Sequence, residues 1–234
     1  YRNSFHVFII YIRVKKMEEE IEIPIFPLNL VVFPGSKINL HIFEPRYRQM
    51  MKYCVQNNTG FGICLIKNGE EVGDSETTPF EVGTYVEFSE IYELPDGRYD
   101  IKVQGINTFK ILNLIYEDLY LKAKVSILKN PNPEVDFSLN EKRQVMKYLT
   151  DYINSMAGLR GEWISDRKVP LDLTPLFTYG MTVLEIPNIE KQKILENQSL
   201  KSQIDAFISI LLKETKKNQI KLDKKFLRDK TILN

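Results

Sequence analysis

Cysteine and histidine are scarce in this sequence, with only two of each among 234 residues. Cys54 and Cys64 belong to no CxxC pair and have no histidine at the spacing of a zinc site. Two cysteines make a disulfide framework improbable, and two histidines, His6 and His41, are too few for most metal sites. We therefore expect free, buried thiols in a reducing compartment, and we predict neither a metal nor any other cofactor.

An excess of charge of either sign is also missing. The sequence balances 32 Lys and Arg residues against 31 Asp and Glu residues, for a formal net charge of +1. Nucleic-acid binding depends on clustered cations that neutralise phosphates, so this balance argues against a nucleic-acid partner. The basic tail, residues 216–234, has two interpretations: a solvated helix end, or a contact with nucleic acid or another anionic surface. Its cations are Lys216, Lys217, Lys221, Lys224, Lys225, Arg228 and Lys230.

Long apolar runs are absent as well. The run from Phe5 to Ile12 is far shorter than the roughly 20 apolar residues that cross a bilayer. RVKKMEEE follows it, where a secretory signal would have a small-residue cleavage site. We expect residues 1–20 to be an extra strand or an extension foreign to the native protein, because Met17 resembles a natural start; a membrane anchor is the weaker alternative. The prediction is a cytoplasmic protein without a membrane partner.

The signatures of common enzyme classes are missing too. The sequence contains no GxxxxGK[ST] phosphate loop, no GxGxxG, no GxSxG elbow and no HExxH. Its carboxylates are scattered, and no pair is marked by its spacing as an acid and base couple. We predict that the protein is not an enzyme, although a site that forms only in three dimensions stays open.

Short strand-like runs separated by turn residues dominate residues 21–128. One amphipathic helix interrupts them, beginning near Pro45 and ending at NNTG. The PDG step predicts a hairpin between TYVEFSEIYEL and RYDIKVQGI, and Gly105 indicates a bulge or bend before a further strand, FKILNLIY. Several strands with one early helix predict a small barrel that is closed or nearly closed.

The pattern becomes helical after residue 128. KNPNPEVDF, residues 129–137, has two prolines and no periodicity, which predicts a linker. Ser138 and Glu141 fit a capping box, and apolar stripes at helical spacing follow through residues 138–215, where we expect a helical subdomain. The inward residues predicted for its last helix are Leu200, Ile204, Phe207, Ile208, Leu211 and Leu212.

Five short steps occur in a fixed order along the β-rich half: Pro-Leu, Phe-Pro-Gly, Phe-Glu-Pro-Arg-Tyr, Val-Gly-Thr and Asp-Gly-Arg. In this order they resemble the LON domain, the N-terminal substrate-recognition domain of ATP-dependent Lon proteases, in the form found in standalone LON-domain proteins. EKQKILENQSLKSQIDAFISILLKE is similar to that family's second subdomain, so the resemblance covers about residues 21–215. It implies an α+β fold in which a β-rich, PUA-like pseudo-barrel is followed by an α-helical bundle.

The resemblance also implies a non-catalytic module that binds unfolded or specific polypeptides, with a Lon-type protease or another protein as partner. RNA binding is the alternative, because PUA-like barrels in other families bind RNA. NLHIFEPRYRQMM, residues 39–51, is either a docking surface or an ordinary boundary between a strand and a helix whose apolar side chains seal the helix onto the barrel. The candidate polypeptide-binding residues are Phe33, Phe43, Arg46, Tyr47, Arg48, Met50 and Met51.

Overall fold

The computed structural model describes residues 20–71, 77–116, 119–128, 137–162 and 169–232. Residues 1–19 and most of the predicted linker at 129–137 therefore lie outside the described residues. The chain forms two compact units, one made of Tyr1–Asn130 with Pro187–Glu196 and the other of Pro131–Ile186 with Asn197–Asn234. The predicted division at residues 128 and 138 stays a prediction, and each unit is described by itself.

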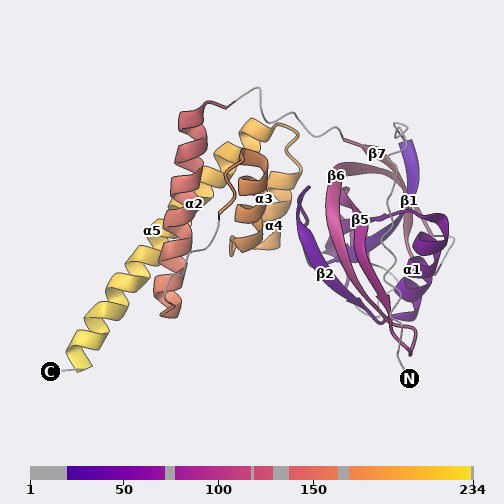
Figure 1. The fold of residues 1–234 in the computed structure, drawn as a ribbon, viewed down its shortest axis with the longest axis horizontal. Coiled ribbons are helices and arrows are strands. Elements are labelled where there is room, and N and C mark those ends of the chain that lie inside the picture. The colour runs from indigo at the N-terminus through magenta and orange to yellow at the C-terminus, as the bar shows by residue number, and fades with distance from the viewer. Residues whose placement is uncertain (1–19, 72–76, 117–118, 129–136, 163–168, 233–234) are drawn as a thin grey trace, which may run out of the picture. The chain divides into compact units, whose positions relative to one another are not determined.

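The first unit contains a closed ring of strands, the helix of residues 45–57 that packs against this ring, and a second helix, residues 188–195 (Figure 1). The strands of the ring follow the order β1–β7–β6–β5–β3, and a parallel pairing of β1 with β3 closes it. Its elements are β1 Glu20–Leu28, β2 Lys37–Ile42, α1 Pro45–Asn57, β3 Phe61–Asn68, β4 Thr78–Pro79, β5 Val82–Glu93, β6 Tyr99–Ile115, β7 Lys122–Ile127 and α4 Asn188–Leu195.

One long strand, β6, holds the barrel together by pairing with three others. Its first part lies between β2 and β5, and its second part pairs with β7. The prediction of two separate strands here was wrong, because a bulge lets one strand continue through the bend. Tyr85 is paired with Asn107 and Val86 with Gly105, so Ile106 is the extra residue, and the bulge expected at Gly105 is confirmed.

Helix α1 begins and ends where local chemistry favours it. Pro45 occupies the first turn, where its missing N–H costs nothing, and Asn58 ends the helix in the left-handed region with a φ of 50°. Tyr47, Met50 and Cys54 recur at three- and four-residue spacing and are buried on one face of the helix. This face packs into a core that includes strand residues from β1, β2, β3, β5 and β6.

Helix α4 belongs to the first unit although it follows α3 in the sequence. Asn188 Nδ2 donates a hydrogen bond to the carbonyl oxygen of Asn29 at 2.7 Å, and Gln192 Nε2 donates one to that of Val82 at 3.0 Å. Gln192 is only 1% exposed. These polar contacts attach the helix to the end of β1 and the start of β5.

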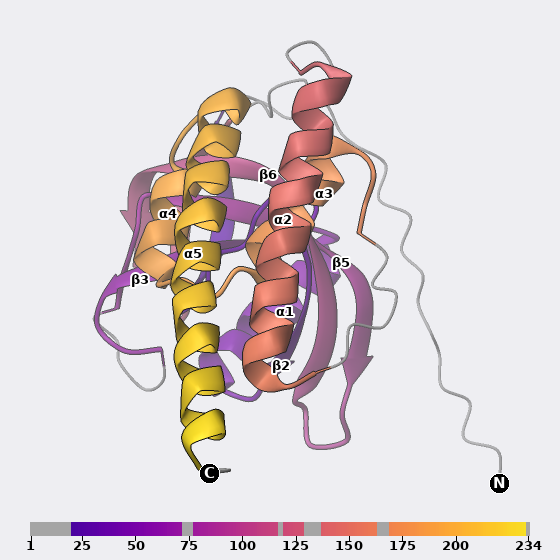
Figure 2. The same cartoon turned by 90° about the vertical axis from the view of Figure 1, so that its left-hand side faces the viewer.

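The second unit contains three helices in its described part: α2 Leu139–Arg160, α3 Leu173–Val183 and α5 Leu200–Ile232. The predicted capping box of Ser138 and Glu141 is confirmed at the start of α2. Helices α2 and α5 lie side by side and run in the same direction (Figure 2). Asn218 Nδ2 of α5 donates to Ser155 Oγ of α2 at 3.0 Å between them.

The apolar face of α5 is narrower than the sequence pattern predicts. Ile204, Phe207 and Leu211 are buried as expected, but Leu212 is 48% exposed, and its predicted inward position was wrong. Leu212 lies about 100° around the helix from Leu211, which carries it off the contact face. Among the helices that the structure describes, none has the length and apolar character that crossing a membrane would require.

Candidate functional site

Four of the seven candidate residues are core residues. Phe33, Tyr47, Met50 and Met51 are each at most 4% exposed, and the last three pack between α1 and the strands. Phe43 is different, because about half of its side chain is exposed at the step from β2 to α1. Arg46 and Arg48 are partly exposed. The polypeptide-binding role of the seven residues stays a prediction. Of these residues, Phe43 and the two arginines are accessible at the surface.

Arg46 is bonded into the fold by several contacts. Its Nε donates a hydrogen bond to Glu44 Oε2 at 3.1 Å, and its Nη2 donates one to the backbone carbonyl of Glu71 at 3.2 Å. The guanidinium also lies 4.6 Å from the centroid of the Tyr47 ring. These contacts join the start of α1 to the loop after β3, so Arg46 has a structural role whether or not it also contacts a partner.

Tyr47 lies beneath that guanidinium and packs its ring 4.1 Å from that of Phe26. Burial raises the pKa of the Tyr47 hydroxyl to about 12, although the nearby Arg46 charge acts in the opposite direction. The hydroxyl is therefore un-ionised at neutral pH. The side chain contributes packing to the core rather than chemistry at the surface.

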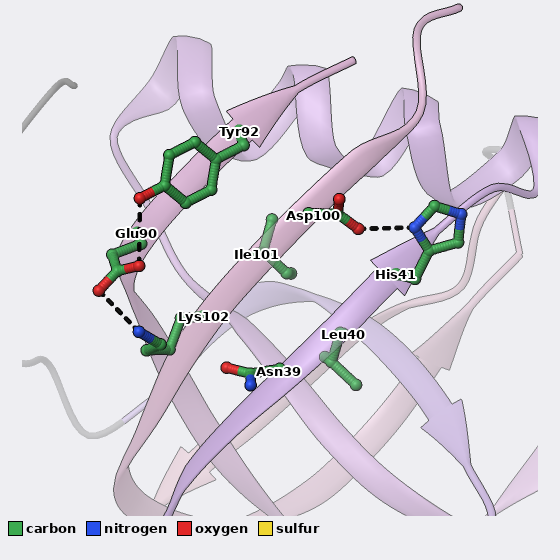
Figure 3. A pocket seen from close by; sticks show the side chains of 8 residues that line it. All are labelled: Asn39, Leu40, His41, Glu90, Tyr92, Asp100, Ile101 and Lys102. Atoms are coloured by element: carbon green, nitrogen blue, oxygen red, sulfur yellow. Dashed lines mark hydrogen bonds and ion pairs between the residues drawn. The ribbon is translucent and has the colours of Figure 1, made fainter. Parts of the chain in front are cut away.

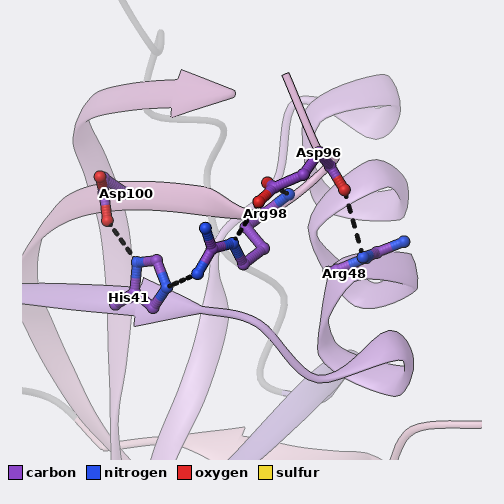
Figure 4. A network of polar contacts seen from close by, with 5 residues as sticks. All are labelled: His41, Arg48, Asp96, Arg98 and Asp100. Carbon is purple, nitrogen blue, oxygen red and sulfur yellow. Dashed lines mark hydrogen bonds and ion pairs between the residues drawn. The ribbon is translucent and has the colours of Figure 1, made fainter. Parts of the chain in front are cut away.

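A row of polar contacts runs from α1 to the end of β2 (Figure 4). Arg48 Nη1 donates to the carbonyl oxygen of Asp96 at 3.4 Å, and Arg98 Nε donates to Asp96 Oδ2 at 2.6 Å. Arg98 Nη1 lies 3.4 Å from His41 Nε2, and His41 Nδ1 lies 2.6 Å from Asp100 Oδ1. Hydrogen bonds from the Arg98 backbone and side chain hold the pKa of Asp96 below its usual value.

A hollow of about 440 Å³ lies beside this row, on the solvent-facing side of β2, β6 and β5 (Figure 3). Lys102 Nζ donates to Glu90 Oε1 at 2.7 Å within it, and the Tyr92 hydroxyl donates to Glu90 Oε2 at 3.3 Å. We call this side of the three strands the outer face, and it includes Asn39, His41, Glu90, Tyr92, Asp100 and Lys102.

Exposed aromatic side chains lie along the outer face. Tyr92 is 44% exposed, and the ring of Phe43 is stacked against that of His41 with centroids 6.1 Å apart. Sequence reasoning found Phe43 but missed the hollow and Tyr92. The alternation in KINLHI was an available signal for the β2 side, because it places Lys37, Asn39 and His41 on one face. The predicted hairpin placed β5 beside β6, but no sequence signal indicated that β2 would pair with the other edge of β6.

Among the residues that the structure describes, no three His, Cys, Asp or Glu side chains are grouped as a metal site would require. Cys54 and Cys64 are free and buried, and burial raises the pKa of Cys54 to about 12 and that of Cys64 further still. Both thiols are therefore protonated at neutral pH, in contrast to the reactive thiolates of catalytic cysteines.

Similarity to solved structures defines the class of the fold. The crystal structure of a Lon N-terminal domain protein from Xanthomonas campestris matches with a TM-score of 0.59 and 19% identity, covering 81% of this chain and 98% of that one. The N-terminal domain of a Mycobacterium avium complex Lon protease matches with a TM-score of 0.55 and 14% identity, covering 81% and 97%. The predicted mixed fold, a strand-rich sheet followed by helices, is confirmed.

The family follows from the sequence match. The model of the ATP-dependent protease La (LON) substrate-binding domain matches residues 22–213, and the chain belongs to this family, as the resemblance predicted. Lon protease from Anaeromyxobacter dehalogenans is 24% identical over 87% of this chain and 24% of its own length. Lon protease from Lawsonia intracellularis is 29% identical over 63% and 18%. The chain spans about a quarter of the length of such relatives.

Proposed function

We propose that residues 22–213 bind polypeptides in an extended or unfolded state and catalyse no reaction themselves. The family is described as the substrate-binding domain of an ATP-dependent protease, and a protease acts on polypeptides. The buried, protonated thiols supply no nucleophile. A Lon-type protease or another protein in the cytoplasm is the proposed partner to which bound polypeptides are passed.

The observation that carries this proposal is the exposed aromatic surface of the outer face. Tyr92 presents a large apolar area on β5, and Phe43 presents one directly after the end of β2; both strands are fixed by pairing with β6. Aromatic residues on a rigid support are the usual anchors of protein interfaces, because they bury much area while losing little conformational entropy. Such anchors contact many different sequences, as a substrate-binding module requires.

Ionisable side chains surround these anchors. His41 with Asp100 and Lys102 with Glu90 form pairs on the outer face, and their side chains are between 38% and 54% exposed. Exposed interface charges act mainly on association rate and on salt dependence, and less on affinity. The outer face therefore favours polypeptides through apolar contact, with modest selection by charge.

A binding titration tests this proposal. The probe is a fluorescently labelled protein that is kept unfolded by reduction and carboxymethylation. We expect the fluorescence anisotropy of this probe to rise when the full chain is added. The double substitution Phe43→Ala and Tyr92→Ala should weaken that binding. Truncating aromatic anchors at interfaces typically costs about 2 kcal/mol or more, which corresponds to at least about a 30-fold loss of affinity. Leu112→Ala is the matched control, because Leu112 is 41% exposed but does not line the hollow.

Two results would contradict the proposal. One is equal affinity of the double variant and the wild type at equal folded concentration. The other is tighter binding of a labelled single-stranded RNA than of the unfolded protein, which would favour the RNA-binding alternative.

A further inference from the structure

Strand β2 has one unpaired edge. Within the described part of the chain it pairs with β6 alone, in the register from Lys37 opposite Gln104 to Ile42 opposite Tyr99. An antiparallel strand turns the N–H and C=O of only every second residue toward its partner. The other residues present their backbone groups on the opposite edge.

The register fixes which residues those are. The Gly105 N–H donates to the Ser36 carbonyl at 2.9 Å, so Ser36 is a residue that bonds to β6. Every second residue after Ser36 also bonds to β6. The residues between them, Lys37, Asn39 and His41, therefore point their backbone groups away from β6. The residues of β2 that bond to β6 are Ile38, Leu40 and Ile42.

The side chains on this edge are suited to an added strand. Those of Lys37, Asn39 and His41 are exposed on the outer face, whereas Ile38 and Leu40 are half-buried on the other face. Side chains of a strand alternate between the two faces of a sheet. An added strand would therefore place every second side chain beside the exposed polar row and the others beside Ile38 and Leu40.

The charged side chains near this edge indicate one feature of a strand that would bind there. Lys102 is paired with Glu90, and His41 lies 2.6 Å from Asp100. Lys37 differs, since among the described residues its ammonium forms no ion pair within 4 Å, and its charge only lowers the pKa of Glu90 from further away. Opposite charges that face each other across paired strands stabilise the pairing.

We propose that an extended segment of an unfolded polypeptide, with a carboxylate side chain facing Lys37, adds to the free edge of β2 as a further strand of the sheet. This inference rests on the proposed function and names its mode of recognition. Backbone hydrogen bonds to Lys37, Asn39 and His41 would supply affinity that does not depend on sequence, as in other cases of strand addition. The outer face and Lys37 would then select among side chains.

Residue-resolved amide hydrogen exchange tests the inference on the unmodified full chain. The probe is the reduced and carboxymethylated protein, whose acidic residues also suit Lys37. At about 100 times Kd, we expect exchange of the Lys37, Asn39 and His41 amides to slow by up to about 100-fold. The amides of Ile38, Leu40 and Ile42 are already bonded to β6 and are the internal control.

The outcomes separate this inference from the proposed function. Binding of the unfolded protein without slowing at the three outward amides overturns strand addition and leaves polypeptide binding intact. Absence of binding in the same samples overturns the proposed function itself.

A pair of substitutions at one position gives an independent readout. Asn39→Pro removes an N–H that points away from β6, and proline is tolerated on edge strands when its position faces solvent. Asn39→Ala removes the same side chain but keeps the N–H. We expect Asn39→Pro to weaken binding at least about tenfold, which corresponds to about 1.4 kcal/mol, and Asn39→Ala to change it little. Equal affinity of the two folded variants would contradict strand addition.

Discussion

The strand and the helix on either side of Phe43 use similar residue types for opposite purposes. On the helix side, Tyr47 and Met50 are buried against the barrel, and Arg46 is bonded to Glu44 and to a loop carbonyl. On the strand side, β2 presents exposed polar side chains on the outer face, and the exposed Phe43 follows directly after it. Apolar and cationic residues in one stretch are therefore accessible to a partner only where the fold does not already use them.

Element geometry explains the difference. Helix α1 commits to the core one face, on which Tyr47, Met50 and Cys54 recur at three- and four-residue spacing. An edge strand of a sheet with one solvated face keeps half of its side chains and half of its backbone groups outside. The same stretch of 13 residues, Asn39 to Met51, thus contributes packing after Pro45 and accessible surface before it.

The largest expected effect concerns the helix side. Met50→Ala removes a fully buried side chain from the main core, and such truncations cost about 2–5 kcal/mol of unfolding free energy. Urea denaturation measures this loss, and Val55→Ala on the exposed side of the same helix should cost less than about 0.5 kcal/mol. Equal costs for the two variants would mean that α1 does not pack through this face.

A smaller effect separates the two arginines. Arg46→Glu loses hydrogen bonds to Glu44 and to the Glu71 carbonyl, and bonds to charged groups contribute about 1.5–3 kcal/mol each at most. We expect a loss of about 1–3 kcal/mol for Arg46→Glu, but about 0.5 kcal/mol or less for Arg48→Glu, because the Arg48 guanidinium makes a single long contact of 3.4 Å with the Asp96 carbonyl oxygen. Thermal melts and binding titrations on both variants give the comparison. Unchanged stability with weakened binding in Arg46→Glu would instead make Arg46 a docking residue.

The smallest effect is the pH dependence of the outer face. The hydrogen bond from Lys102 lowers the pKa of Glu90 below its ordinary value of 4.5. A carboxyl whose pKa is lowered by folding stabilises the fold above its unfolded pKa, and this stabilisation is lost as pH falls through the folded value. We expect the melting temperatures of wild type and Glu90→Gln to differ slightly above pH 4.5 and to converge below it. A difference that grows as pH falls would show that the sign is wrong.

Local sequence patterns predicted the elements well where a single segment decides the outcome. The capping box at Ser138 and Glu141, the proline start of α1 and the hairpin turn at Gly97 all form as expected, because each depends on residues a few positions apart. The ordered steps around Phe-Glu-Pro-Arg-Tyr identified the family. Fold class was therefore within reach of the sequence alone.

Long-range partners explain what the sequence could not show. Arg46 contacts Glu71, 25 residues away, and Phe33 is buried beneath Gly105, where an added Cβ would lie 2.5 Å from the Phe33 carbonyl oxygen. Neither contact leaves a local periodicity. The same reason applies to Tyr92, since the long-range pairing of β2 with β6 brings the β5–β6 hairpin, and Tyr92 with it, into one face with β2.

Site-specific photocrosslinking tests the contrast between strand side and helix side most directly. Benzoylphenylalanine would replace Tyr92 on the outer face in one variant and Val55 on α1 in a second, since both positions are exposed to a similar degree. With the reduced and carboxymethylated protein present, we predict strong crosslinks from position 92 and weak or no crosslinks from position 55. Crosslinks from position 55 that equal or exceed those from position 92 would contradict the assignment of polypeptide binding to the outer face.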